Sequence, residues 1–326
     1  MSVAAIQAGL PMESVAMTVN RLCSSALQAV VTTAQNILLG DCDFGIGGGV
    51  EVMSRGAYLS PAMRSGARMG ETKVFDSMVA TLTDPFGVGH MGITAENLAV
   101  KWGITREQQD ALAAESHRRA AAAIAAGHFK SQILPIVQQT KKGEVILHTD
   151  EHVKANTTME TLAKMKPAFK KDGSVTAGNA SGINDGAAFL VLADADAAKA
   201  AGSKPLARLV SYAVAGVPNE IMGEGPIPAT TAAPKKAGLK LEQFDLIEPN
   251  EAFAPQAIAV ARGLEFDMKK VNPNGGAIAL GHPIGCSGAF LATKAIYELQ
   301  RSGGRYALVT MCIGGGQGIA AAFERV

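Results

Sequence analysis

The sequence contains the same local pattern twice, and this duplication constrains the fold more than any other feature. A cysteine followed by small residues opens each copy, at Cys23 and at Cys286, and a stretch with helical apolar spacing follows it. Each copy then reaches a glycine triplet, at 47–49 and at 314–316, with the first glycine 24 and 28 positions after the cysteine. Two copies in the same order indicate an internal duplication of a strand–helix–strand unit.

Apolar runs and helical patterns alternate in the second part of the chain. We expect strands at 206–214, 244–247, 270–272 and 305–311, and a helix at 252–262. The run at 305–311 is almost continuously apolar, which is typical of a strand covered on both faces. The sequence therefore predicts a layered α/β fold.

The region 54–177 differs in character from both copies. It holds an alanine-rich helical pattern at 106–126 and a charged stretch at 141–154, with few strand patterns. An excursion of this length more often covers a functional site than merely connects two elements. We therefore predict an N-terminal half at 1–53, a cover domain at 54–177, the end of the N-terminal half at 178–204 and a C-terminal half at 205–326.

The two copies differ in how much chain precedes them. Only 22 residues precede Cys23, whereas about 81 positions of strand and helix patterns separate Pro205 from Cys286. If the halves are equivalent, the first lacks its opening strand and helix. We therefore expect a first half that is truncated at its N-terminus and has exposed sheet edges.

Charge and cysteine usage exclude several classes of function. The chain has 30 basic and 29 acidic residues, so no global field attracts nucleic acid or an anionic membrane. No apolar run approaches the length of a bilayer span. The four cysteines form no Cys-x-x-Cys pair, and no histidines stand at zinc-finger spacing. We expect free thiols, no metal, no nucleic acid or membrane partner, and a cytoplasmic location.

Two polar residues in the second half are candidates for catalysis. His282 lies in a Gly-His-Pro turn within the glycine-rich stretch 272–285, where it could transfer a proton or donate to an oxyanion. A histidine that only satisfies the turn fits this pattern equally well. Asn250 follows the strand at 244–247, at the carboxyl end where α/β sheets bind ligands. It could cap the next helix, or it could orient a water or an oxyanion.

Two of the cysteines are candidates for reactive groups. Cys23 opens a helical pattern, where the helix dipole and unpaired N–H groups favour the thiolate. Cys312 ends an apolar strand, and the glycines that follow it, beginning with Gly314, can present bare backbone N–H groups. Cys42 and Cys286 fit packing roles better. The glycines at 45–49 do not open a helix in a Gly-x-Gly-x-x-Gly pattern, so a dinucleotide site is only weakly indicated.

Four segments together resemble the thiolase family. Residues 20–25 (Asn-Arg-Leu-Cys-Ser-Ser) look like its nucleophile segment. Residues 250–253 (Asn-Glu-Ala-Phe), 281–285 (Gly-His-Pro-Ile-Gly) and 312–316 (Cys-Ile-Gly-Gly-Gly) look like its other catalytic segments. The loops at 89–97 and 178–182 also match, and the similarity is strongest to the bacterial acetyl-CoA acetyltransferase and broad-range 3-ketothiolase branch. The resemblance implies a duplicated, five-layered αβαβα fold with a long covering insertion.

The resemblance also implies a mechanism. An acyl group passes through a thioester on Cys23 in a ping-pong reaction, with His282 assisting this thiol. Cys312 acts as acid and base at the α-carbon, while a water on Asn250 and the backbone N–H of Gly314 help to stabilise oxyanions. The reaction is the condensation of acetyl-CoA with an acyl-CoA, or the thiolytic cleavage of a 3-ketoacyl-CoA. CoA and its thioesters are the substrates, no further cofactor is needed, and a homodimer or homotetramer is expected.

Further residues stand at positions that line the CoA path in relatives. One of them, Lys154, stands where relatives often carry arginine, and a lysine cannot make a bidentate phosphate contact. Pro249 and Ala26 also depart from the family pattern, but neither change removes a reacting atom. The expected CoA-lining residues are Ser181, Leu82, His90, Met91, Lys154, Phe169, Ala177, Met222, Ala252 and Phe253.

Other functions stay open at this point. The chain could be a catalytically impaired fragment that only binds CoA or acyl-CoA, because its N-terminus is missing, or a lipid-binding scaffold of the same fold. The intact Cys23, His282 and Cys312 argue against the scaffold, while the impaired fragment stays an alternative. A decarboxylating ketosynthase of this architecture would carry a second histidine in place of Cys312.

Overall fold

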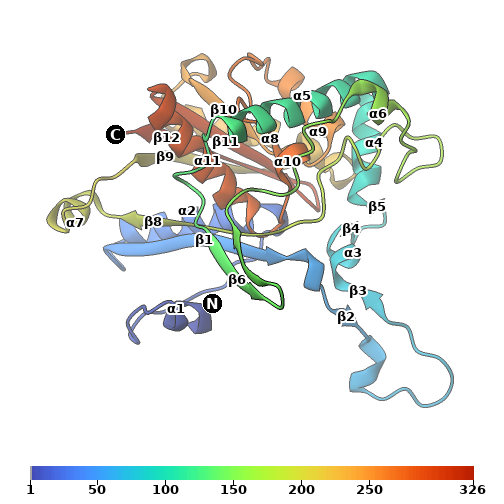
Figure 1. Cartoon of the computed structure of the whole chain (residues 1–326), viewed down its shortest axis with the longest axis horizontal. Coiled ribbons are helices and arrows are strands. Elements are labelled where there is room, and N and C mark those ends of the chain that lie inside the picture. Colours follow the sequence, from blue (N-terminus) through green and yellow to red (C-terminus); the bar gives the residue numbers. More distant parts are fainter. Residues whose placement is uncertain (1) are drawn as a thin grey trace.

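The computed structural model describes residues 2–326, and its core is a four-stranded sheet in the C-terminal half. The sheet has the order β10-β11-β12-β9. β10 (Leu246–Pro249) runs parallel to β11 (Tyr306–Ile313), while β12 (Gln317–Arg325) pairs antiparallel with β11 and with β9 (Ala207–Gly216). β11 and β12 are the two inner strands of this sheet, which lies in the upper part of Figure 1.

Helices cover this sheet on both faces. α11 (Ser287–Ser302) packs on one face together with Val309 of β11. α8 (Pro226–Lys236) and α9 (Ala254–Gly263) pack on the other face, together with Leu308. Successive strand residues point to opposite faces, so both sets of β11 side chains are buried. This explains the continuous apolar run and confirms the predicted layered α/β fold.

The N-terminal half repeats part of this plan. A 3₁₀ turn, η1 (Leu22–Ser24), leads into α2 (Ser25–Leu38), and β1 (Phe44–Val52) pairs antiparallel with β8 (Asp185–Ala193). α2 packs on this two-stranded sheet beside α11, and α11 also contacts β1 and β8 directly. The layers therefore alternate between helix and strand, and Figure 1 shows β1 and β8 running side by side below the central sheet. The outward face of the β1–β8 pair carries exposed apolar side chains: Phe44, Ile46, Val50, Val52, Phe189 and Val191.

The two glycine triplets occupy different places in the two copies. Residues 47–49 lie inside β1, where a Cβ on Gly47 would come within 2.7 Å of the Val30 backbone. Residues 314–316 form the turn after β11, where Gly315 and Gly316 have φ angles of 81° and 88° that favour glycine. The two cysteine-to-glycine spacings therefore do not end at equivalent positions. What the two copies share is the order of their elements: a helix, a strand and a strand antiparallel to it.

The other predicted elements agree with the structure in most places. The helix predicted at 106–126 is α5 (Arg106–Ala125), and the strand predicted at 206–214 is β9. The strand predicted at 270–272 is wrong: only one bridge, between Val271 and Ile247, forms there, because Asn272 has a φ of 41° and turns the chain away.

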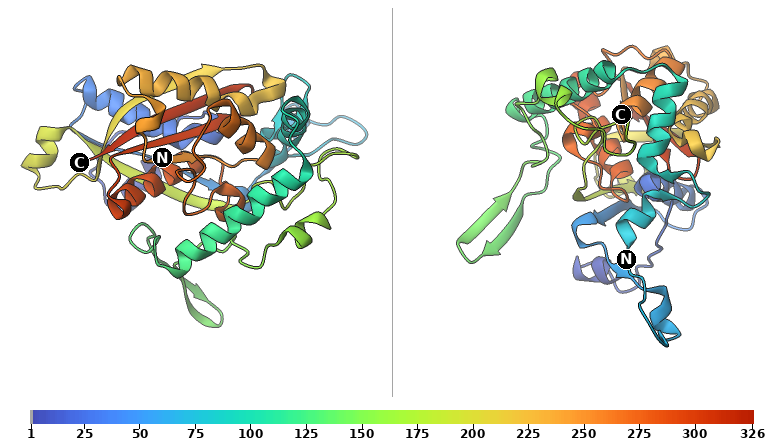
Figure 2. Two further views of the ribbon diagram at one scale, coloured as in Figure 1. Left: turned by 90° about the horizontal axis from the view of Figure 1, so that it is seen from above. Right: turned by 90° about the vertical axis from the view of Figure 1, so that its right-hand side faces the viewer.

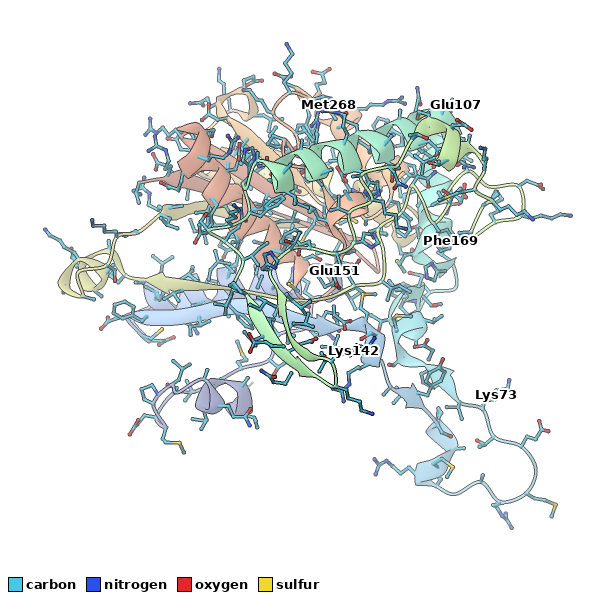
Figure 3. The ribbon with its side chains drawn as sticks, in the orientation of Figure 1. Lys73, Glu107, Lys142, Glu151, Phe169 and Met268 are labelled. Atoms are coloured by element: carbon cyan, nitrogen blue, oxygen red, sulfur yellow. The ribbon has the colours of Figure 1, made fainter. Side chains whose placement is uncertain are left out.

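The region 54–177 contains two long helices and a projecting hairpin, and its role as a cover stays a prediction. α4 (Met91–Lys101) and α5 lie against the C-terminal half, and α5 packs along α10 (Ala277–Leu280). The hairpin of β6 (Ile136–Thr140) and β7 (Gly143–Leu147) projects from the body (Figure 2), and Figure 3 places Lys142 at its tip. The short elements are α1 (Ser2–Gln7), η2 (Met53–Arg55), β2 (Tyr58–Leu59), η3 (Pro61–Arg64), β3 (Phe75–Asp76), α3 (Ser77–Thr81), β4 (Thr83–Asp84), β5 (Gly89–His90), α6 (Met159–Ala163), α7 (Ala195–Ala200), η4 (Asn219–Glu224) and η5 (Leu241–Gln243).

Every helix among residues 2–326 is too short or too polar to cross a bilayer.

Candidate active site

Cys23 lies in η1, directly before α2, and its side chain is half-buried. Burial raises the pKa of this thiol to about 11, although the backbone N–H groups of Gly314 and of Cys23 itself oppose the rise, and the negative charge of Glu51 adds to it. The prediction that the helix opening makes Cys23 a thiolate is therefore wrong for the resting protein, because desolvation outweighs the N–H groups. Cys23 needs a base when it reacts.

The backbone around Cys23 is held in an uncommon conformation. Leu22 has a φ of 45°, which is rare outside glycine and is found where surrounding structure fixes the chain. A Cβ on Gly314 would lie 3.2 Å from a methyl group of Leu22 and 3.4 Å from the sulfur of Met91. The glycine after Cys312 thus lets the β11–β12 turn approach the nucleophile segment.

Cys312 lies in β11 with no solvent exposure. It forms a buried apolar cluster with residues of the cover and of the segment after β10, among them Met91 and Ala252. Burial raises the pKa of the Cys312 thiol above its ordinary value, and negative charge on Cys23 raises it further. The two thiols are therefore close enough to influence each other, and both are protonated at neutral pH.

His282 is buried, and its two ring nitrogens have different partners. Nδ1 lies 2.6 Å from Ser287 Oγ, and this hydroxyl donates its own proton to the carbonyl of Pro283 at 2.7 Å. The hydroxyl can only accept from the ring, so Nδ1 carries the proton and Nε2 presents its lone pair. Burial lowers the pKa of His282 to about 4. The imidazole is therefore neutral at pH 7 and can accept a proton at Nε2.

Asn250 faces the reactive nitrogen of His282. Its Nδ2 lies 3.4 Å from Nε2 of the imidazole, and its backbone N–H donates to Thr310 in β11 at 2.9 Å. Phe253 is the N-cap of α9, so Asn250 does not cap that helix. The Oδ1 of Asn250 is buried and has no hydrogen-bond partner among residues 2–326. An acceptor in this state can order a polar group of a ligand or a water.

Pro249 is tolerated before Asn250 for a topological reason. It is the last residue of β10, which lies at an edge of the sheet. An edge strand does not need every N–H for its ladder, so a proline there costs little.

Sequence reasoning missed two residues that fix the His282 turn. Ser287 sets the imidazole tautomer, as described above, and its only signal was its place at the start of a helical pattern. Glu51 accepts a hydrogen bond from the Gly285 N–H at 2.9 Å, across 234 positions of chain. A Cβ on Gly49 would lie 1.9 Å from the Gly285 carbonyl oxygen, so β1 and the turn meet backbone to backbone.

Seven of the predicted CoA-lining residues gather beside Cys312. Met91, Met222, Ala252 and Phe253 belong to its buried cluster, and Phe169 packs against them. The His90 ring stacks on Phe169 at 4.8 Å between centroids, and Ser181 donates to the carbonyl of Ala252 through both its N–H and its hydroxyl at 3.0 Å. Figure 3 places Phe169 on the chain segment beside α4.

The other three predicted CoA-lining residues lie outside this cluster. Leu82 is half-buried and accepts a backbone hydrogen bond from Met91 at 2.8 Å. Lys154 and Ala177 are exposed, and the Lys154 N–H donates to Nδ1 of His117 at 3.1 Å. Their contact with CoA stays a prediction.

The residues present do not form a metal centre. Within residues 2–326, no three histidine, cysteine, aspartate or glutamate side chains are grouped so that they could hold a metal ion.

Family models match the chain over nearly its whole length. The thiolase N-terminal domain matches residues 1–196 and the thiolase C-terminal domain matches residues 203–325.

Individual relatives and solved structures agree with these matches. The chain is 57% identical to a beta-ketothiolase of Cupriavidus necator and 48% identical to the mitochondrial 3-ketoacyl-CoA thiolase of Homo sapiens. These alignments cover 99% and 97% of this chain and 82% and 80% of the relatives. The crystal structure of the Bacillus anthracis acetyl-CoA acetyltransferase superposes with a TM-score of 0.97 at 45% identity, over 100% of this chain and 82% of that one. The chain belongs to the thiolase family.

Proposed function

We propose that the protein is an acyl-CoA C-acyltransferase that cleaves 3-ketoacyl-CoA with CoA, or condenses acetyl-CoA with an acyl-CoA in the reverse direction. One arrangement carries this proposal: Cys23 lies close enough to Cys312 to raise the pKa of its thiol, and the Cys312 cluster includes Ala252, two residues after the Asn250 amide that meets the neutral imidazole of His282. Relatives named acetyl-CoA acetyltransferase, beta-ketothiolase and 3-ketoacyl-CoA thiolase support it, as does the solved structure of the human 3-ketoacyl-CoA thiolase in complex with CoA.

The first half of thiolysis forms the acyl-enzyme. The Cys23 thiol gives its proton to Nε2 of His282, and the thiolate attacks the 3-keto carbon of the substrate. The C2–C3 bond then breaks, so the acyl group stays on Cys23 and acetyl-CoA leaves as its enolate. The Cys312 thiol protonates the α-carbon of this enolate and becomes a thiolate.

The second half restores both cysteines. Cys312 takes the proton of the incoming CoA thiol, and the CoA thiolate attacks the acyl group on Cys23. The Cys23 thiolate leaves and recovers its proton from His282, so no proton is gained or lost over the cycle.

Each half needs donors at a developing oxyanion. The backbone N–H groups of Cys23 and Gly314 lie beside the Cys23 sulfur, and we infer that they donate to the carbonyl oxygen of the attacked carbon, which becomes the tetrahedral oxyanion. Asn250, whose Oδ1 can hold a water, and His282 lie together where the enolate oxygen would be bound. Donors held at fixed positions stabilise a developing negative charge without having to reorganise.

We also propose that the protein is a homo-oligomer of the cytoplasm that takes no cofactor besides its CoA substrates. Exposed apolar side chains on the β1–β8 face and on the β6–β7 hairpin, such as Ile136 and Ile146, support self-association. Light scattering coupled to size-exclusion chromatography tests this part, and a monodisperse monomer at micromolar concentration would refute it.

The test of the activity is the loss of acetoacetyl-CoA absorbance on addition of CoA, with mass spectrometry of the protein mixed with acetyl-CoA. We expect cleavage and an acetyl group on the peptide that contains Cys23. Tight binding of CoA without cleavage would instead support the CoA-binding fragment, and an acetyl group on another residue would refute the assignment of Cys23.

A further inference from the structure

The loop that carries His282 is anchored by a buried carboxylate that takes no part in the chemistry above. Glu251 follows Asn250 directly and is 3% exposed. Its Oε1 accepts from the side-chain amide of Asn272 at 2.8 Å, and its Oε2 accepts from the hydroxyl of Ser116 at 2.7 Å and from the Ile278 N–H at 3.3 Å. The carboxylate therefore bonds to the start of the loop, to the helix α10 that leads into His282, and to the cover.

Glu251 has no cationic partner. None of the salt bridges among residues 2–326 includes it, and the buried Lys294 nearby pairs with Glu248 instead. A buried carboxylate without a counter-charge is costly unless several donors satisfy it. The donors are Asn272 in the loop, Ile278 in α10 and Ser116 in α5. The carboxylate therefore joins these three segments and forms no ion pair.

The loop is shaped around this carboxylate. A Cβ on Gly276 would lie 2.1 to 2.4 Å from the carboxyl atoms of Glu251, so only glycine leaves room for it. The Gly276 N–H donates to Ser116 Oγ at 3.0 Å, and this hydroxyl in turn donates to Glu251. Ser116 thereby links α5 of the cover to the loop through Glu251.

We propose that Glu251 is a positioning residue that holds the 272–281 loop so that His282 meets Asn250, and that Ser116 couples the covering helix α5 to this anchor. The inference rests on the thiolase reaction proposed above. Glu251 touches neither substrate nor the reacting atoms, and it acts by fixing the backbone on both sides of the 3.4 Å contact between Asn250 and His282.

The first test is Glu251→Gln, which keeps the shape but replaces an acceptor by a donor. The new N–H₂ group of the glutamine must then face at least one of the donors that bind Glu251: Asn272, Ser116 or the Ile278 N–H. Two donors cannot bond to each other, so we expect the loop to shift. We expect kcat for acetoacetyl-CoA cleavage to fall about 10- to 100-fold, while KM changes by less than about threefold. Solvent deuterium exchange into the methyl group of acetyl-CoA should slow by a similar factor, because His282 and Asn250 bind the enolate.

Two further variants keep the proposal falsifiable. Ser116→Ala removes one hydrogen bond and should lower kcat about 3- to 10-fold, with no further loss when it is added to Glu251→Gln. Glu324→Gln neutralises a buried carboxylate at the far end of β12, which pairs with Arg208 and Arg305, and serves as a control for loss of stability. It should keep kcat.

A readout independent of activity is hydrogen exchange of the Gly276 and Ile278 amides, which should be at least about tenfold faster in Glu251→Gln. If the unchanged protein cleaves acetoacetyl-CoA but Glu251→Gln retains its kcat, the inference is wrong while the proposed function stands. Unchanged exchange at both amides would also overturn it. If the unchanged protein is inactive, the proposed function fails, and the exchange experiment alone decides whether Glu251 anchors the loop.

Discussion

The two copies of the helix–strand–strand unit are buried to very different degrees. Every residue of β11 after Tyr306 is buried, whereas β1 alternates between exposed and covered positions, and only Gly47 in it is fully buried. The cysteines that open the two helices differ in the same way, since Cys286 is buried and Cys23 is half-buried. The buried second copy forms the core of the fold, and the partly covered first copy carries the nucleophile Cys23.

The distribution of chemistry follows this division. Asn250, His282 and Cys312 all belong to the C-terminal half, where two helical layers hold the sheet. Only Cys23 comes from the N-terminal half. Because the nucleophile and its three partners come from different halves, Cys23 can reach the substrate while the partners stay fixed in the buried half.

The largest expected effect separates the two helix-opening cysteines. Cys23→Ser should lower kcat at least about 10³-fold, because the hydroxyl is a much weaker nucleophile. Cys286→Ser should leave kcat within about threefold, since this thiol packs beside Gly186 and burial raises its pKa to about 12. The absorbance assay with acetoacetyl-CoA and CoA measures both. Equal losses in the two variants would break the division of roles between the copies.

The next effect concerns a buried charge that only the second helix has. Lys294 on α11 is fully buried, pairs with Glu248 at 2.6 Å and donates to the Gly275 carbonyl, whereas α2 carries no charged residue. Lys294→Met should lower the free energy of unfolding by about 3 to 5 kcal/mol, because Glu248 is left buried without a counter-charge. Lys199→Met on the exposed face of α7 is the control. Denaturant titrations that show the same loss for both variants would contradict the prediction.

A pH dependence of stability is expected from His282. Its pKa is lowered from 6.5 to about 4 in the folded protein, so the unfolded chain binds its proton first as the pH falls. Stability is therefore complete above pH 6.5 and is lost between there and pH 4, by roughly 2 to 3 kcal/mol between pH 7 and pH 4.5. The measurement is the difference between the unmodified protein and His282→Gln in denaturant titrations at these two pH values. A constant difference would show that the imidazole is not desolvated.

The smallest effect compares one substitution in the two equivalent strands. Val309→Thr in β11 should cost about 1 to 3 kcal/mol, because it buries a hydroxyl in an apolar cluster. Val50→Thr on the outward face of β1 replaces a side chain that is 52% exposed and should change stability by about 0.5 kcal/mol or less. Thermal unfolding of both variants gives the comparison. Equal costs would mean that the β1–β8 face is covered in solution.

Much of this architecture could be predicted from local patterns. The continuous apolar run of β11 and the helical spacing of α5 reflect burial that each segment experiences along its own length. The candidate groups Cys23, Asn250, His282 and Cys312 also stood out, because the glycines and strand ends beside them are visible in the sequence. Their convergence followed only from the resemblance to a family.

What the sequence did not reveal depends on contacts between distant segments. Glu51 reaches Gly285 across the two halves, and no spacing signals such a pair. The thiolate expected at Cys23 was wrong for the same reason, since desolvation of the thiol is set by segments that pack over it. The glycine triplets were wrongly taken as equivalent positions. Glycine allows close backbone approach in β1 and a left-handed turn after β11, and the sequence alone does not distinguish these two roles.

The backbone contact between Gly49 and Gly285 makes the strand register a condition for catalysis. If β1 slipped by two residues along β8, Glu51 or Gly47 would replace Gly49 opposite the turn, and the N–H of Gly285 would lose its acceptor. A misaligned first half could still be compact, yet the turn that carries His282 would lose its contact with β1. The pairing register of β1 with β8 is thus a requirement for activity, because only the correctly paired sheet supports the turn that carries His282.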